Sequence, residues 1–203
     1  MILKKLAIEI LNIATETGAD FAEIYLEEDS HATISVDNGK VETIHDVLSY
    51  GAGIRLFNGL QSVYGYTNDL TSKGLKKLAR DLAVSFSETR KIEVKTIKKV
   101  RQKKKNQPKI PYESYPREKI VEMLKEASKV MKNYDESVVR TTANFAYSNK
   151  KVEIYNTDGR HLTDYRSRGI ASLLAVAAKE GKIETFRTAK GAQKGMEYFI
   201  KET

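Results

Sequence analysis

The hydrophobic residues of the N-terminal segment recur with the period of an α-helix. Between residues 2 and 16 they fall three or four positions apart, which gives one apolar stripe and an outward polar face (Leu3, Leu6, Ala7, Ile10, Leu11 and Ala14). Gly18 follows as a plausible C-terminal cap, because glycine takes up a positive φ without strain. The pattern therefore predicts a first helix over residues 2–16.

Two later segments return to helical spacing. Residues 71–86 place apolar side chains on one face, and Thr71 or Asp69 supplies the N-cap. Pro116 suits the first turn of a third helix, which has apolar residues at heptad-like spacing. The sequence thus predicts about three amphipathic helices.

Between these helices the pattern has the period of two that is typical of strands. Residues 22–27 alternate, and 34–36 run into an Asn38-Gly39 turn with a return strand over 41–45. A second hairpin is predicted from 50–57 and 61–66 across Asn58-Gly59. The natural interpretation is an antiparallel meander.

The C-terminal half is predicted to contain further strands. Residues 138–147 alternate, Asn149 is taken as a turn before 152–155, and Asn156 to Gly159 form another turn. Residues 160–178 and 182–189 fit a long hairpin, although 171–178 fits a helix equally well. Residues 92–100 fit the beginning of a strand.

This order of elements indicates an α+β fold with antiparallel β-sheet and about three helices, rather than a doubly wound parallel sheet. We interpret residues 1–203 as one domain. It has sub-blocks 1–92 and 110–203, joined by a basic connection over 93–109.

Composition narrows the class of protein. The chain has no cysteine, which excludes disulfide and thiolate chemistry, and no apolar run approaches the length of a membrane span. The first residues lack the pattern of a signal peptide. We therefore expect a cytoplasmic protein without a membrane segment.

The net charge of +8 comes from one segment. Residues 90–109 contain ten Lys or Arg and a single acid, Glu93, so the rest of the chain is nearly neutral. Lys103, Lys104 and Lys105 are candidate contacts for a polyanion. No aromatic residue lies between Phe86 and Tyr112, so a solvated lysine-rich connection is the favoured interpretation over a nucleic-acid module.

No residue pattern identifies a catalytic or metal site. The three histidines, His31, His45 and His161, are scattered over 130 residues, without the spacing of zinc ligands. Tyrosine is abundant, and several tyrosines fall on predicted strands (Tyr50, Tyr64, Tyr66, Tyr147 and Tyr155). Such tyrosines suit a peptide-binding or dimer surface, but they also suit any half-exposed sheet.

Several short segments with glycine turn points resemble the N-terminal domain of the TldD/PmbA family, also known as modulators of DNA gyrase. They are Gly18-Ala19-Asp20 with Ala22-Glu23, Asn38-Gly39-Lys40-Val41-Glu42, Gly51-Ala52-Gly53-Ile54-Arg55 and Gly65-Tyr66-Thr67-Asn68-Asp69-Leu70. Weaker agreement continues through Asn156-Thr157-Asp158-Gly159. Independently of the family, Gly39 and Gly59 suit turns with positive φ, and Gly51 and Gly53 suit close backbone approach within a strand. Gly65 is grouped with these structural glycines.

The resemblance implies a two-domain zinc metallopeptidase that works as a homodimer or paralogous heterodimer on peptides or unfolded segments. Its zinc site rests on a His-Glu-x-x-x-His motif beyond a domain like this one. None of the three histidines here is followed by glutamate in that arrangement, so hydrolysis by this chain alone is not supported.

Two function hypotheses follow. The favoured one is a non-catalytic assembly and peptide-guiding domain of a TldD/PmbA-type metalloprotease, in which an exposed sheet edge accepts an extended peptide. The alternative is a stand-alone nucleic-acid-associated or gyrase-modulating protein that acts through residues 90–109. A remnant with only a structural role is a third possibility.

Overall fold

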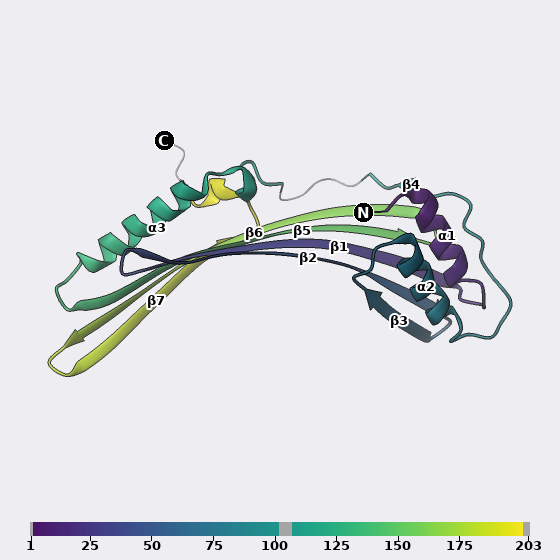
Figure 1. The fold of residues 1–203 in the computed structure, drawn as a ribbon, viewed down its shortest axis with the longest axis horizontal. Helices are drawn as coiled ribbons and strands as arrows, with labels where there is room; N and C mark the ends of the chain where they lie inside the picture. The colour runs from purple at the N-terminus through teal and green to yellow at the C-terminus, as the bar shows by residue number, and fades with distance from the viewer. Residues whose placement is uncertain (1, 102–106, 201–203) are drawn as a thin grey trace. The chain divides into compact units, whose positions relative to one another are not determined.

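The computed structural model describes residues 2–101 and 107–200 and shows the expected α+β fold (Figure 1). Three α-helices accompany a seven-stranded, mostly antiparallel sheet. The elements are α1 Lys4–Ala14, β1 Phe21–Asp37, β2 Lys40–Asn58, β3 Gln61–Thr67, α2 Ser72–Ala83, β4 Lys98–Lys99, η1 Tyr112–Ser114, α3 Arg117–Lys132, β5 Val138–Asn156, β6 Arg160–Lys179, β7 Lys182–Ala192 and η2 Met196–Tyr198.

The strands follow the order β3-β2-β1-β5-β6-β4, with β7 paired to β6. The β2–β3 and β6–β7 pairs are antiparallel, whereas the short β4 runs parallel to β6. Between β1 and β5, the N–H of Asn38 donates to Thr141 O and the N–H of Thr157 donates to Ala22 O. The first bond joins the end of β1 to the start of β5, and the second joins the start of β1 to the end of β5. The strands β1 and β5 therefore also run in opposite directions.

The hairpin turns have the positive backbone φ angles that are typical of tight turns between antiparallel strands. Asn38 and Gly39 have φ of +47° and +76°, and Glu180 and Gly181 have φ of +50° and +77°. Two successive residues with positive φ define the type I′ turn, whose twist matches that of the flanking strands. Gly59 has a φ of +58° at the β2–β3 turn.

The strands are longer than the sequence patterns predicted. The segments 22–27 and 34–36 belong to one strand, β1, and the segments 41–45 and 50–57 belong to β2. The turn predicted at Asn149 is wrong, because this residue lies inside β5. Its side-chain Oδ1 accepts a hydrogen bond from Ser167 Oγ at 2.7 Å, so a cross-strand partner outweighs the turn preference of asparagine.

The structure also decides two predictions about residues 171–178 and 92–100. Residues 171–178 form part of β6, so the helical alternative is wrong. Of the strand expected over 92–100, only β4 forms. Val94 exchanges backbone hydrogen bonds with the side chain of Asn12, at 2.8 and 3.0 Å, instead of with another strand.

The described chain divides into two compact units. Within the described residues, unit 1 comprises residues 2–29, 49–101 and 151–165, and unit 2 comprises residues 30–48, 107–150 and 166–200. The earlier division into 1–92 and 110–203 stays a prediction. None of the described helices is both long enough and apolar enough to cross a membrane.

The core of unit 1 lies between one face of its strands and the helices α1 and α2. Four residues of the predicted stripe are buried in α1 (Ala7, Ile10, Leu11 and Ala14), whereas Leu6 is partly buried and Leu3 precedes the helix and is exposed. The helix α2 contributes Leu75, Ala79 and Leu82. Gly65 belongs to β3, where an added Cβ would lie 2.9 Å from Leu78 Cδ1 and 3.1 Å from Leu82 Cδ2. Glycine therefore allows α2 to pack closely on β3.

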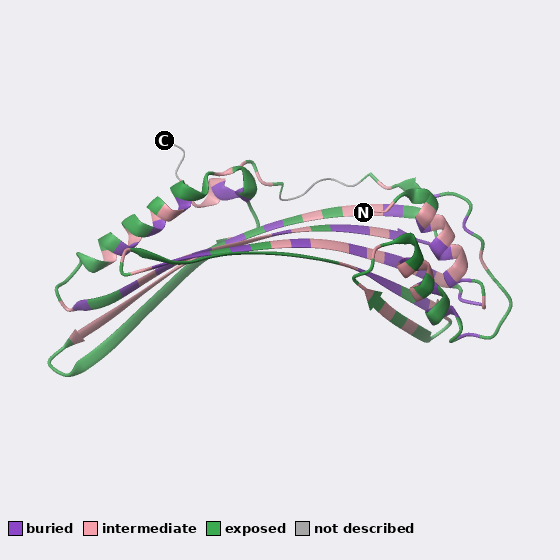
Figure 2. Ribbon diagram, in the orientation of Figure 1, coloured by how far each residue is buried: buried purple, intermediate pink, exposed green. Residues whose placement is uncertain are grey.

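The core of unit 2 is built around α3 and a cluster of aromatic rings. Ile120 and Leu124 of α3 are buried with Phe145 and Tyr112. The rings of Phe145 and Phe199 meet edge to face, with centroids 5.0 Å apart. In Figure 2 the helices carry buried stripes, whereas β7 is exposed along nearly all of its length.

The N-cap of α2 offers a direct test of this fold. Thr71 Oγ1 accepts a hydrogen bond from the N–H of Gly74 at 3.1 Å. We expect Thr71→Ala to lower the free energy of unfolding by about 1 kcal/mol, because that N–H loses its partner. Thr71→Ser keeps the hydroxyl and serves as the control. Urea denaturation measures both, and equal stability of the two variants would contradict the assigned cap.

Candidate functional site

A tyrosine-lined hollow lies on the strands of unit 1. It has a volume of about 650 Å³ and is lined by residues of β1, β2 and β3 and the residue after β3 (Tyr25, Glu27, Ser49, Tyr50, Gly51, Ala52, Gly53, Tyr64, Tyr66, Thr67 and Asn68). Three tyrosines singled out by the sequence, Tyr50, Tyr64 and Tyr66, meet here and are largely exposed. The hollow therefore gathers the exposed aromatic surface of unit 1.

Two of the predicted structural glycines form part of this hollow. A Cβ on Gly53 would lie 2.7 Å from the hydroxyl of Tyr64, so this glycine makes room for an aromatic ring, not for backbone. At Gly51 the nearest atom is the backbone oxygen of Thr67, at 3.4 Å. These glycines leave β2 without side chains beside the tyrosines of β3.

The strand β3 is an edge of the sheet, with β2 as its one partner among the described residues. Asn58 and Gln61 flank the two-residue turn and are paired. Such a pair exchanges both main-chain hydrogen bonds, and bonded pairs then alternate along the ladder. Ser62, Tyr64 and Tyr66 consequently direct their N–H and C=O groups away from β2, toward the free edge.

One carboxylate and one guanidinium lie at or beside the hollow. The hydroxyl of Tyr25 donates to Glu27 Oε2 at 2.7 Å, which holds a carboxylate at the hollow. The guanidinium of Arg55, opposite Tyr64 in the ladder, lies over the Tyr64 ring at 5.3 Å from its centroid. One ring of the hollow thus already attracts a cation.

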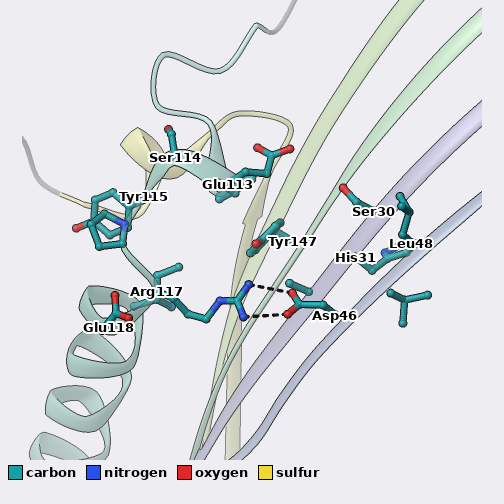
Figure 3. Close-up of a pocket in the computed structure, with 15 residues that line it drawn as sticks. Ser30, His31, Asp46, Leu48, Glu113, Ser114, Tyr115, Arg117, Glu118 and Tyr147 are labelled. Atoms are coloured by element: carbon teal, nitrogen blue, oxygen red, sulfur yellow. Dashed lines mark hydrogen bonds and ion pairs between the residues drawn. The ribbon is translucent and has the colours of Figure 1, made fainter. Parts of the chain in front are cut away.

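A second concavity lies in unit 2, beside the start of α3 (Figure 3). It has a volume of about 670 Å³. Arg117 points from the first turn of α3 to Asp46 of β2, and its two terminal nitrogens donate to the two carboxylate oxygens at 2.9 and 3.1 Å. The planar guanidinium suits this two-pronged geometry.

Aromatic rings form one wall of this concavity. Tyr147 lies beside Arg117 (Figure 3) and stacks on Tyr112, with centroids 5.0 Å apart. Partial burial raises the pKa of Tyr147, and the neighbouring Arg117 opposes that rise. Tyr147 therefore stays a neutral phenol at neutral pH.

The three histidines do not converge. His31 lines the groove of unit 2, His45 lies exposed on β2, and His161 is buried in unit 1. His161 Nε2 is 3.5 Å from the buried carboxylate of Glu153, and its ring stacks on Tyr155 with centroids 4.3 Å apart. No group of three His, Cys, Asp or Glu that could hold a metal exists within 2–101 and 107–200. A zinc ion therefore does not fit the described residues.

The remaining predicted residues fall outside these sites. Gly39 and Gly59 occupy hairpin turns. Lys103, Lys104 and Lys105 lie outside the described residues, so their contact with a polyanion stays a prediction. Sequence reasoning missed the Tyr25–Glu27 pair and the Arg117–Asp46 pair. The first had a signal, since residues two apart on a strand share a face; the second joins residues 71 positions apart and had none.

Two family models match the chain in succession. The model described as PmbA/TldA metallopeptidase domain 1 matches residues 22–97, and the PmbA/TldA metallopeptidase central domain matches residues 110–202. Together they cover most of the chain. The chain belongs to the PmbA/TldD metallopeptidase family.

Curated relatives agree with this assignment. The chain is 22% identical over 181 residues to the "Metalloprotease TldD homolog" of Buchnera aphidicola, covering 89% of this chain and 38% of that protein. With the protein of the same name from Haemophilus influenzae it shares 21% identity over 207 residues, covering 95% and 40%. The chain therefore spans about two fifths of the length of these relatives.

Solved structures show the same fold. The chain resembles a proposed modulator of DNA gyrase from Bacteroides thetaiotaomicron, with a TM-score of 0.75, 14% identity, and coverage of 96% of this chain and 46% of that one. The corresponding values for a proposed modulator from Thermotoga maritima are 0.73, 16%, 95% and 44%. TldE from Thermococcus kodakarensis gives 0.66, 16%, 93% and 43%.

The buried His161 predicts a pH dependence of stability. Burial lowers the pKa of its imidazole below the usual 6.5, although the carboxylate of Glu153 opposes this effect. The unfolded chain then binds the proton more readily, so the contribution of His161 to stability is lost as pH falls through about 6.5 toward the folded pKa. NMR titration of the His161 ring should give a midpoint below 6.5. A midpoint at or above this value would contradict the assignment.

Proposed function

We propose that this chain is the assembly and peptide-guiding portion of a TldD/PmbA-type metalloprotease, with zinc and hydrolysis supplied by a part of the protein outside the described residues. The observation that carries the proposal is the free edge of β3. There, Ser62, Tyr64 and Tyr66 direct main-chain groups outward, and Tyr64 and Tyr66 line the hollow. The family and the lack of a metal-binding group among the described residues support this division of labour.

Strand addition explains how such an edge selects its ligand. An extended peptide bonds to the main chain of an edge strand, and its alternate side chains occupy neighbouring pockets. A peptide residue opposite Tyr64 would direct its side chain to the same face as that tyrosine. Peptides and unfolded segments can lay an extended main chain along such an edge, so this mode favours them as ligands.

Assembly is the other part of the proposal, with an identical or a paralogous chain as partner. The strand β7 supports it, because it runs for 11 residues with β6 as its only partner in the described chain. Its Ile183 and Phe186 are 71% and 70% exposed. A long edge with exposed apolar residues is a common site of association.

The peptide-guiding function predicts alternating sensitivity to backbone methylation. We expect the purified chain to bind an extended heptapeptide, as measured by isothermal titration calorimetry. N-methylation at every second residue should abolish binding in one phase, where the methylated N–H faces β3, and be tolerated in the other. The peptide should remain intact when zinc is added. Equal loss in both phases, or cleavage well above the blank, would contradict the proposal.

The assembly function predicts sensitivity at β7. We expect Phe186→Lys to shift the chain toward monomer in size-exclusion chromatography with light scattering, because a charge at this edge opposes association. Leu60→Lys is the matched control, since Leu60 is fully exposed in the β2–β3 turn. A chain that is monomeric before substitution, or equal shifts in both variants, would argue against β7 as the assembly edge.

A further inference from the structure

A further free strand edge lies in unit 2, on residues 40–48 of β2. The strand β3 pairs with β2 over residues 52–58, so in residues 40–48 β2 has β1 as its one strand partner among the described residues. Every residue of this part of β2 is exposed. The main-chain groups on its outer side are therefore available to another extended strand.

The two carboxylates of this edge already have partners within the chain. Glu42 accepts a hydrogen bond from Ser35 Oγ at 3.3 Å, and Asp46 holds the guanidinium of Arg117. The apolar side chains of the edge remain open to solvent, with exposed fractions between 41% and 63% (Val41, Ile44, Val47 and Leu48). What the edge offers a ligand is therefore main chain and apolar surface.

The groove beside the start of α3 lies next to this edge, because Val47 and Leu48 belong to both. The buried part of its lining is apolar or aromatic (Ala32, Tyr112 and Ile120), whereas its charged lining residues are exposed. Its volume of about 670 Å³ is ample for a large side chain. The groove therefore has the lining that favours an apolar group.

The two features face the same way. Asp46 and Leu48 lie two positions apart on β2 and so share a face of the strand. Arg117 reaches Asp46 from α3, so this face is turned toward α3, and Leu48 lines the groove on that side (Figure 3). In a strand added to the edge, every second side chain would point to this face, beside Leu48 and toward the groove.

We propose that the edge of β2 in unit 2 binds an extended peptide segment and that the groove takes up a leucine or phenylalanine side chain of that segment. The free main chain selects an extended segment, and the buried rings select an apolar side chain, because a polar one would lose its hydrogen bonds to water there. This inference does not rest on peptide guiding at β3, since it uses another strand edge, in the other unit.

The test follows two heptapeptides, one with a central leucine and one with asparagine in its place, by two-dimensional NMR of the isotope-labelled chain. We expect the leucine peptide to bind about 10-fold more tightly, because its side chain leaves water in the groove. Its amide shifts should fall on residues 40–48, whose outer N–H groups gain partners. Shifts confined to residues 61–67 would overturn this inference and leave the proposed function intact. Shifts in residues 40–48 alone would do the reverse.

Variants assign the preference to the groove. Leu48→Asn should remove most of the preference for leucine, and Val130→Asn should leave it unchanged. Val130 is the matched control because it is 62% exposed, close to the 63% of Leu48, and lies on α3 outside the groove lining. Circular dichroism checks that each variant is folded.

Three results would overturn the inference. They are equal binding of the two peptides, a preference that survives Leu48→Asn, and an equal loss of preference in Val130→Asn. Light scattering examines a second copy of the chain as the occupant. A dimer that forms without peptide and dissociates in Leu48→Asn, but not in Val130→Asn, would assign this edge to a second copy and would also overturn the proposal.

Discussion

The structure depends on the register of four long strands. β1, β2, β5 and β6 contain 17, 19, 19 and 20 residues, and each contributes to both compact units. In β1 the even-numbered positions are buried from Ala22 to Leu26 and again from Ala32 to Val36. A slip by one residue would move both sets to the opposite face. The same register therefore places apolar side chains in the cores of both units. The turn at Asn38-Gly39 between β1 and β2 and the turn at 157–159 between β5 and β6 fix this register at the strand ends.

Sequence reasoning identified the parts of the fold that local patterns control. The helices at α1, α2 and α3 follow from apolar spacing, and the type I′ turn follows from Asn-Gly. It failed where distant partners decide the outcome. Asn149 lies in a strand, where Ser167 donates to its side-chain oxygen, and Val94 lies outside the sheet, where Asn12 bonds to its backbone. Neither partner can be recognised from the sequence around the residue that it holds.

In the candidate site too, the sequence identified individual residues but not which of them lie together. Tyr64, Tyr66, Gly51 and Gly53 each stood out in the sequence, yet their meeting in one hollow depends on the β2–β3 register, in which Gly53 pairs with Tyr66. The role of Gly53 changed accordingly. Local reasoning assigned it to close backbone approach, but the structure places the ring of Tyr64 against it. A glycine in a strand indicates close approach, and only the fold identifies what approaches.

The described residues do not bring a set of metal ligands together. Metal-dependent hydrolysis needs several ligands that converge on one ion, and the histidines of this chain lie apart, with His161 committed to a buried contact with Glu153. Free strand edges recognise a main chain, which every peptide shares, and so they discriminate little between sequences. The edge of β3 presents such main-chain groups, and the tyrosine-lined hollow lies beside it, so the peptide recognition proposed above would use both features.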